Sequence, residues 1–208
     1  DPEAGAQAFS ILIGEAGMAG FERGRNLEKM GMKAQDTSEL FFNDVKVPKD
    51  NLLGEAGMGF IYLMRELPQE RLSIAVSAVA ACEAVIQETV KYVKQRTAFG
   101  KAIADFQHTQ FKLAELEAEV TVMRVFIDRC AELLVKKELS TVEASKSKLL
   151  ATVLQGKVTD QCVQMHGGYG YMWEYPVARA YADARVQRIY GGTSEVMKLI
   201  IGRDLLAD

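Results

Sequence analysis

The sequence has little cysteine, little histidine and almost no excess charge. Its three cysteines, Cys82, Cys130 and Cys162, stand far apart, and none forms a CxxC or Cys/His spacing. This argues against a disulfide framework and the usual metal motifs, and it favours a reducing compartment in which these residues are small buried apolar side chains. A formal net charge of -3 gives no general reason to bind nucleic acid or an anionic membrane surface.

Other absences narrow the class of protein further. We find no stretch of about 20 apolar residues, no internal repeat and no low-complexity segment, and we expect no signal peptide. Apolar residues make up 49% and charged residues 25% of the 208 residues, which is typical of a globular protein. The length suits one domain, or one domain with part of another.

Two patterns divide the chain. Residues 1–54 contain two segments that resemble strands, "AFSILI" (8–13) and "ELFFNDVKVP" (39–48), separated by glycine-rich loops. About fifty residues with three or four strands make a poor core, so we predict an incomplete β domain whose partner strands lie upstream. Residues 55–208 follow the helical period instead, which predicts a mainly α fold: an up-down antiparallel bundle of long helices.

The helical pattern is most regular after Phe106. Apolar residues there are spaced alternately by three and four, which predicts a helix that packs lengthwise against others; they are Leu113, Leu116, Val120, Met123, Ile127, Cys130 and Leu134. We expect further helices at about 59–95, bent near Pro68, and from a cap at Ser140 or Thr141 to Gly167. Two shorter helices should cover 176–187 and 194–206.

A turn at "RIYGGTSEVMK" (188–198) looks like an active-site loop. Gly191 and Gly192 free the backbone, and Thr193 or Ser194 can cap the helix that follows. A loop that removes a proton needs a carboxylate, and the glycines offer none. The base, if there is one, must come from elsewhere.

Three further segments stand out: "PQERL" (68–72), "RTAFGKAIADFQ" (96–107) and "CVQMHGGYGYMWEYP" (162–176). Each segment alone is weak evidence for a function. A Gly-Gly-x-Gly turn is often a helix C-cap, and His166 could be a structural histidine. Arg96 could be a solvated residue near a helix end, and Gln107 could be an N-terminal cap. Together with "YGGTSE" and in this order, these segments resemble the C-terminal half of the acyl-CoA dehydrogenase family. The resemblance covers nearly the whole chain.

The resemblance implies that the protein binds FAD and no metal. By this resemblance, Arg96 and Gln107 contact the phosphates or the adenine end of FAD across a subunit interface. The backbone of the turn formed by Gln164, Met165, His166, Gly167 and Gly168 approaches the cofactor of the neighbouring subunit. Thr193, Ser194 and Glu195 contact the cofactor of their own subunit. Guanidinium suits phosphate, and glycine permits a close backbone approach.

Most members of the family have a glutamate base at the position of Gly191. A branch that resembles isovaleryl-CoA and long-chain acyl-CoA dehydrogenases places it on the first long helix before Arg-Leu, where this chain has Glu70. Glu66, four residues earlier on the same helical face, is the competing candidate, and Glu70 could instead pair with Arg71. By the same resemblance, the Gly191 N–H and an FAD hydroxyl polarise the thioester carbonyl, and Pro68, Gln69, Arg71 and Gly192 line the substrate site.

The implied reaction is α,β-dehydrogenation of an acyl-CoA to a trans-2-enoyl-CoA, with electron-transfer flavoprotein as acceptor and a homotetramer as the assembly. The location would be cytoplasmic in a bacterium and the mitochondrial matrix in a eukaryote. Nucleic-acid and membrane partners are not expected. Because the family's N-terminal helical domain and first β half are missing here, we expect this chain alone to bind FAD weakly and to have little activity. The alternatives are an acyl-CoA oxidase-like flavoenzyme and an inactive fragment that acts as an oligomerisation bundle.

Overall fold

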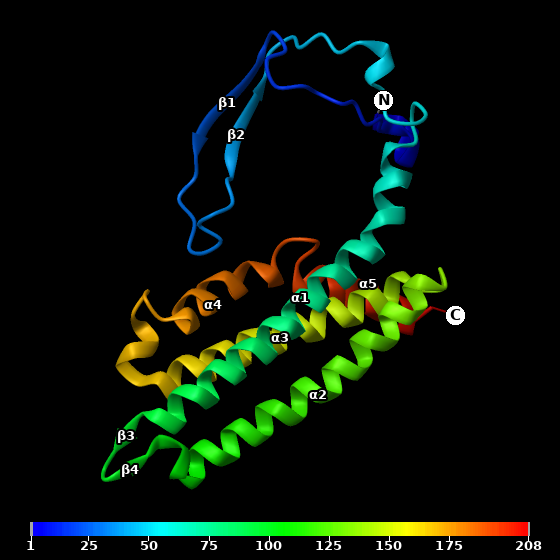
Figure 1. Ribbon diagram of the computed structural model, residues 1–208. Coiled ribbons are helices and arrows are strands. Elements are labelled where there is room, and N and C mark those ends of the chain that lie inside the picture. Colours follow the sequence, from blue (N-terminus) through cyan, green and yellow to red (C-terminus); the bar gives the residue numbers. More distant parts are fainter. Residues whose placement is uncertain (1, 208) are drawn as a thin grey trace. The chain divides into compact units, whose positions relative to one another are not determined.

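The computed structural model describes residues 2–207 and contains two compact units, divided between Leu67 and Pro68 (Figure 1). The division falls inside the first long helix, α1 (Gly59–Gln95), at a proline that cannot donate a backbone hydrogen bond to the preceding turn. The sequence placed its domain boundary at 54/55 instead, and that boundary stays a prediction.

The long helices begin and end close to the predicted positions. α2 covers Gln107–Val135, but its N-cap is Phe106, so Gln107 is its first residue rather than a cap. α3 covers Thr141–His166 and starts at a capping box in which the Ser140 hydroxyl accepts from the Glu143 N–H, 3.1 Å away. It ends at Gly167, whose φ of +59° is a conformation that glycine adopts without strain.

α3 is the central helix of the second unit. It contacts α2, α4 (Pro176–Ala184) and α5 (Ser194–Leu205). This surrounds it on several sides and buries polar as well as apolar residues along it. Its buried threonines donate to the carbonyl four residues earlier, as Thr152 does to Lys148 at 2.8 Å, so their hydroxyls are satisfied inside the bundle.

The apolar seam predicted on α2 faces the core. Leu116, Val120, Ile127 and Cys130 are at most 2% exposed, and Leu113, Met123 and Leu134 pack against them partly buried. They meet residues of α1 and α3, including Val79 and Val158, which are fully buried. All three cysteines are free and buried, as the sequence predicted. The helical fold class is therefore confirmed.

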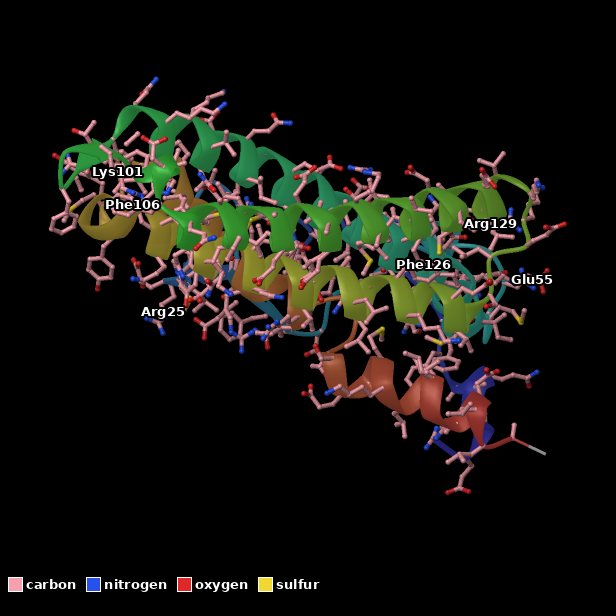
Figure 2. All side chains as sticks on the ribbon, turned by 90° about the horizontal axis from the view of Figure 1, so that it is seen from below. Arg25, Glu55, Lys101, Phe106, Phe126 and Arg129 are labelled. Carbon is pink, nitrogen blue, oxygen red and sulfur yellow. The ribbon has the colours of Figure 1, made fainter. Side chains whose placement is uncertain are left out.

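Short elements connect the helices of the bundle. The two-residue strands β3 (Thr97–Ala98) and β4 (Lys101–Ala102) form a hairpin between α1 and α2, followed by a 3-10 turn η3 (Ile103–Asp105). Figure 2 places Lys101 and Phe106 at the hairpin end of the bundle and Arg129 at the other end. The Lys101 ammonium lies 4.2 Å from the centre of the Phe106 ring. The 3-10 turns η4 (Gly167–Tyr171) and η5 (Arg185–Arg188) connect α3 to α4 and lead from α4 towards α5.

The first unit contains one antiparallel hairpin, β1 (Phe21–Asn26) with β2 (Ser38–Phe42), and two 3-10 turns, η1 (Pro2–Ala8) and η2 (Lys49–Asn51). The predicted strand at 39–48 is confirmed only in its first part, which forms β2 up to Phe42, and residues 43–48 are not a strand. The predicted strand at 8–13 is wrong, because only Leu12 makes a ladder contact there, an isolated bridge to Leu52. A strand needs a neighbour along its whole length, and this segment pairs only through residues 11–13, which bond to residues 51–53.

α1 is long and apolar enough to cross a membrane by length and composition, with 39% of its most apolar window buried. This corrects the statement that no stretch could do so. The same helix supplies Leu72, Val79 and Ile86 to the bundle core, so burial between helices accounts for its apolar residues.

Candidate functional site

The twin-glycine corner is held at positive φ, a conformation that favours glycine. Gly191 has φ +63° and Gly192 has φ +99°, a region that other residues adopt only with strain. A Cβ on Gly191 would lie 2.6 Å from Ile74 Cδ1, and one on Gly192 would lie 2.7 Å from Met197 Cε. Both atoms are the far ends of flexible side chains, so the corner favours glycine chiefly through its positive φ, and a glutamate at 191 would add backbone strain and displace the Ile74 side chain.

Two buried cations bind the two carbonyls of the corner. Arg71 of α1, which is 5% exposed, donates from Nε to the Gly191 oxygen at 3.4 Å and from Nη1 to Ser145 Oγ at 3.4 Å. Lys148 of α3, which is 0% exposed, donates from Nζ to the Gly192 oxygen at 2.6 Å. The corner is therefore tied to α1 and to α3 through its backbone.

Burial dominates the electrostatics of both cations. It lowers the pKa of Arg71, an effect that the neighbouring Glu70 carboxylate opposes. It also lowers the pKa of Lys148, and the charge of Arg71 lowers that pKa further while Glu195 raises it. Two positive charges thus share one poorly solvated region behind the corner.

Glu70 lies at the edge of this arrangement. It precedes Arg71 and stands one helical turn before Ile74, the residue that touches Gly191, so residues 70 and 74 share a face of α1. Its side chain is exposed, and within residues 2–207 the structure gives it no hydrogen bond or ion pair. The alternative pairing with Arg71 is not formed, since that guanidinium binds Gly191 and Ser145.

The competing base, Glu66, belongs to the first unit, whereas Glu70 and the corner belong to the second. Pro68 and Gln69 come just before Glu70 on α1. Within the second unit, the part of α1 that carries Glu70 therefore lies beside the glycine corner, which Arg71 and Ile74 contact.

The corner leads into the N-terminus of α5. Thr193 is the N-cap, and its hydroxyl oxygen accepts from the Val196 N–H at 3.3 Å. The pKa of Glu195 is lowered, first by its own backbone N–H and then by the Thr193 hydroxyl. Ser194 Oγ is buried and has no hydrogen-bond partner in the described chain. A buried hydroxyl without a partner is uncommon, and a polar ligand beside it would satisfy it.

A second candidate region is a groove of about 570 Å³ at the far end of α3. It is lined by Tyr92, Arg96, Ile103, Gln164, Met165, His166, Gly167, Gly168, Tyr169 and Met172. The structure thus brings Arg96 together with the whole 164–168 turn, two segments that the sequence had assigned to one cofactor. Gln107 is not among the lining residues; it is exposed at the start of α2.

The groove is open beside the protein backbone at Gly167 and Gly168, so a ligand can approach that backbone closely. A Cβ added to Gly167 or Gly168 would meet nothing within 4 Å, whereas one on Gly170 would lie 2.3 Å from the Val163 oxygen. The Arg96 guanidinium lies 5.5 Å from the centre of the Tyr169 ring, at the mouth of this space. An open glycine backbone beside an arginine fits a phosphate-bearing group such as FAD.

His166 has a structural environment in this groove. It is 6% exposed, its Nδ1 lies 2.8 Å from the Cys162 carbonyl oxygen, and its ring stacks on Tyr92 at 4.2 Å. Burial lowers its pKa, which favours the neutral ring with Nδ1 as the donor. We therefore assign its side chain to packing and leave its backbone as the candidate contact.

The corner and the groove contact α1 far apart along its length, the corner at Arg71 and Ile74 and the groove at Tyr92 and Arg96. Arg71 and Gln95 are separated by roughly 36 Å of helix at 1.5 Å per residue. One phosphate or one ring of a cofactor cannot touch both regions of the same chain. Each region therefore presents part of a binding site.

Comparison with known proteins decides the family. A family model described as "Acyl-CoA dehydrogenase, C-terminal domain" matches residues 57–206. The mouse mitochondrial long-chain specific acyl-CoA dehydrogenase is 56% identical over 203 residues, 98% of this chain and 47% of the relative. This chain belongs to the acyl-CoA dehydrogenase family.

Solved members of the acyl-CoA dehydrogenase family share the fold. The acyl-CoA dehydrogenase of Geobacillus kaustophilus matches with a TM-score of 0.95 and 49% identity, over 97% of this chain and 53% of that one. An acyl-CoA dehydrogenase complexed with FAD from Bacillus anthracis matches with a TM-score of 0.90 and 32% identity, over 95% of this chain and 37% of that one. The chain spans about half the length of the first two relatives.

Sequence reasoning missed Lys148, Ser145 and Ile74. Lys146 and Lys148 look alike in the segment "ASKSKLL", yet Lys146 is exposed and Lys148 is fully buried. No periodic signal separates them, because α3 is surrounded by other helices and buries polar residues too. Only the fold shows which lysine faces the corner.

Proposed function

We propose that the complete protein is an FAD-dependent acyl-CoA dehydrogenase that converts an acyl-CoA thioester to a trans-2-enoyl-CoA, with Glu70 as the base. The observation that carries this proposal is the glycine corner, held against α1 at Arg71 and Ile74 beside Glu70. Its backbone conformation disfavours a carboxylate at residue 191, and an unpaired carboxylate stands nearby on the helix. Membership of the family supports the reaction class.

The roles follow from the chemistry of a weakly acidic α-proton. Glu70 removes that proton, which requires its oxygen to reach about 3 to 3.5 Å from the α-carbon. The Gly191 N–H donates to the thioester oxygen, where negative charge develops as the proton leaves. Pro68, Gln69, Arg71 and Gly192 surround the reacting groups. When FAD is bound, it supplies the two-electron acceptor for the hydrogen that leaves the β-carbon.

We further propose two sets of residues for FAD. Thr193, Ser194 and Glu195 would contact the cofactor of their own subunit, supported by the unpartnered Ser194 hydroxyl. Arg96, Gln107 and the 164–168 turn would contact the cofactor of a neighbouring subunit, supported by the open glycine groove. The separation of the two regions in one chain favours a site shared between subunits, as in a homotetramer. By family resemblance, electron-transfer flavoprotein is the acceptor.

Substitution of Glu70 in the complete protein tests the base. Loss of a general base slows a reaction by about 10²- to 10⁴-fold, so we expect Glu70→Gln to lower kcat by that factor while acyl-CoA still binds. Glu66→Gln is the matched control: it makes the same change on another exposed residue of α1, and we expect near-normal turnover. Near-normal turnover in Glu70→Gln would refute the assignment, and a loss confined to Glu66→Gln would transfer it to that residue.

A flavin spectrum separates the remaining alternatives. Adding an acyl-CoA without oxygen should bleach the flavin band of a dehydrogenase, and opening the cuvette to air should consume little oxygen. Rapid oxygen consumption would support an oxidase instead. A complete protein that carries no flavin would support a non-catalytic bundle. By family resemblance we place the protein in the cytoplasm of a bacterium or the mitochondrial matrix of a eukaryote.

A further inference from the structure

Lys148 is a lysine that packing alone does not explain. It is 0% exposed on the central helix, and the structure gives its ammonium one hydrogen-bond acceptor among the described residues, the Gly192 oxygen. None of the ion pairs within 4 Å in residues 2–207 involves Lys148, and the negative charge that acts on it is that of Glu195. Burying an unpaired charge is unfavourable, and an apolar residue of similar length would avoid that penalty. A role at the corner accounts for its presence.

The corner is a backbone that needs an anchor. Two successive glycines have more rotational freedom than any other residue pair, and a flip of one peptide plane would turn its N–H away from a ligand. The Gly191 oxygen is bound by Arg71 and the Gly192 oxygen by Lys148. Because C=O and N–H point in opposite directions in a trans peptide, the N–H groups of Gly192 and Thr193 are directed away from these cations.

The N–H groups of the corner make no hydrogen bond within residues 2–207. The described structure gives no hydrogen-bond acceptor to the backbone N–H of Gly191, Gly192 or Thr193. Three consecutive free donors, with two adjacent carbonyls fixed from behind, form a site for an oxygen that carries negative charge. A cation on a carbonyl also polarises the N–H of the same peptide and strengthens it as a donor.

We propose that Lys148 is a positioning residue for the acyl-CoA thioester. It fixes the peptide between Gly192 and Thr193, while Arg71 fixes the peptide between Gly191 and Gly192. The two cations together hold the corner in the shape that presents the adjoining Gly191 N–H to the thioester oxygen. The buried charge of Lys148 also favours negative charge on that oxygen. This inference rests on the proposed function, because it assumes that the corner receives a thioester carbonyl.

The test compares three variants of the complete protein with bound FAD. Lys148→Met removes both the charge and the donor, and Lys148→Gln keeps a donor without the charge. Lys146→Met makes the same change two residues away on an exposed face of α3 and is the matched control. The main readout is the infrared stretch of an isotope-labelled thioester carbonyl. The ligand is an acyl-CoA whose β-carbon carries no hydrogen, so that it binds without being oxidised.

We expect the bound carbonyl of the wild type to shift to lower frequency and Lys148→Met to lose more than half of that shift. With a normal substrate, kcat should fall about 10- to 100-fold, less than for a lost oxyanion donor, with a smaller change in KM. Lys148→Gln should fall between the two. The melting temperature of Lys148→Met should stay within about 4 °C of the wild type, since the removed charge offsets the unsatisfied carbonyl. Lys146→Met should match the wild type throughout.

An unchanged carbonyl shift and kcat in Lys148→Met would overturn the proposal, as would an equal effect of Lys146→Met. Failure of both Lys148 variants to fold or to retain flavin would assign the lysine a purely structural role and would also overturn it. Failure of the proposed function is distinguishable: a wild type that polarises the carbonyl but oxidises no acyl-CoA refutes the reaction and not the lysine. Glu70→Gln should keep the shift and lose turnover.

Discussion

The helical unit after Pro68 and the part up to Leu67 differ in what stabilises them. Val79 and Val158 in the helical unit are fully buried, whereas no apolar side chain of residues 3–67 is buried to that extent. Phe42 on β2 is 62% exposed and stacks on Phe21 at 4.9 Å. One unit has a core of its own, and the other is held by backbone pairing and turns.

This difference places the candidate site. The corner, both buried cations and the groove all belong to the unit that has a core. Side chains that must hold a backbone within a fraction of an ångström need rigid supports, and packed helices provide them. The packed helices therefore order the candidate site residues of this unit.

The largest expected effect comes from opening the core. We expect Ile127→Ala, at a position that is 1% exposed, to lower the free energy of unfolding of the 208-residue chain by about 2 to 5 kcal/mol. Phe42→Ala in β2 should cost at most about 1 kcal/mol, chiefly through the lost ring pair. Urea unfolding followed by circular dichroism measures both.

Equal costs for the two substitutions would contradict this difference between the units, since Phe42 would then contribute as much to stability as a core residue. The same two substitutions can be measured in a longer protein with the complete β domain. If further strands cover the exposed face there, as the sequence led us to expect, Phe42→Ala should become much more costly while Ile127→Ala stays unchanged.

The next largest effect is a local loss of stability in the first unit, caused by Gly20→Ala. A Cβ on Gly20, where φ is +83°, would lie 2.0 Å from the Asn43 oxygen, so Gly20→Ala must displace the strand end and weaken the bond from the Asn43 N–H to the Gly20 oxygen, 2.8 Å. Gly17 has a similar φ of +96° but open space around it. Gly17→Ala should therefore cost only the backbone strain, about 1 kcal/mol.

Amide hydrogen exchange distinguishes these two glycine variants. In Gly20→Ala we expect faster exchange at Asn43 and along β1 and β2, and unchanged protection in α1 to α3. In Gly17→Ala the strand amides should exchange nearly as in the wild type. Loss of protection in the helices of either variant would contradict the view that the two units are stabilised separately.

The sequence predicted the helical unit better than the first unit, for physical reasons. The period of the α2 seam and the capping box at Ser140 are local signals, and both are confirmed. The segment at 8–13 has a strand-like composition but lacks a neighbouring strand, so composition alone misled. A strand is defined by its partner, and a helix carries most of its hydrogen bonds within itself.

Some features of the candidate site could likewise be predicted from the sequence, and others could not. The twin-glycine turn and the α5 cap could be read from the sequence, and the resemblance to a family indicated that Arg96 and the 164–168 turn belong together. The bonds from Arg71 and Lys148 to the corner could not be predicted, since they join residues 120 and 44 positions apart. Such contacts depend on how three helices pack, which no local pattern encodes.

The smallest expected effect concerns an ion pair between α1 and α2. The Arg124 guanidinium donates to both oxygens of Glu83, from Nε at 2.8 Å and from Nη2 at 2.7 Å. These hydrogen bonds lower the pKa of Glu83. The side chains are 31% and 37% exposed, so solvent screens the pair, and we expect Glu83→Gln to lower stability by no more than about 1 kcal/mol at neutral pH.

The sign of the pH dependence follows from the lowered pKa. Because the folded state binds the Glu83 proton less readily than the unfolded state, the stabilisation is complete above the ordinary carboxyl pKa and is lost as the pH falls through the lower, folded value. The difference in stability between wild type and Glu83→Gln should therefore shrink in acid. Glu88→Gln, in an exposed pair with Lys91 on α1, is the control and should differ little from the wild type at any pH. A difference for Glu83→Gln that persists unchanged in acid would assign its effect to packing between the helices rather than to charge.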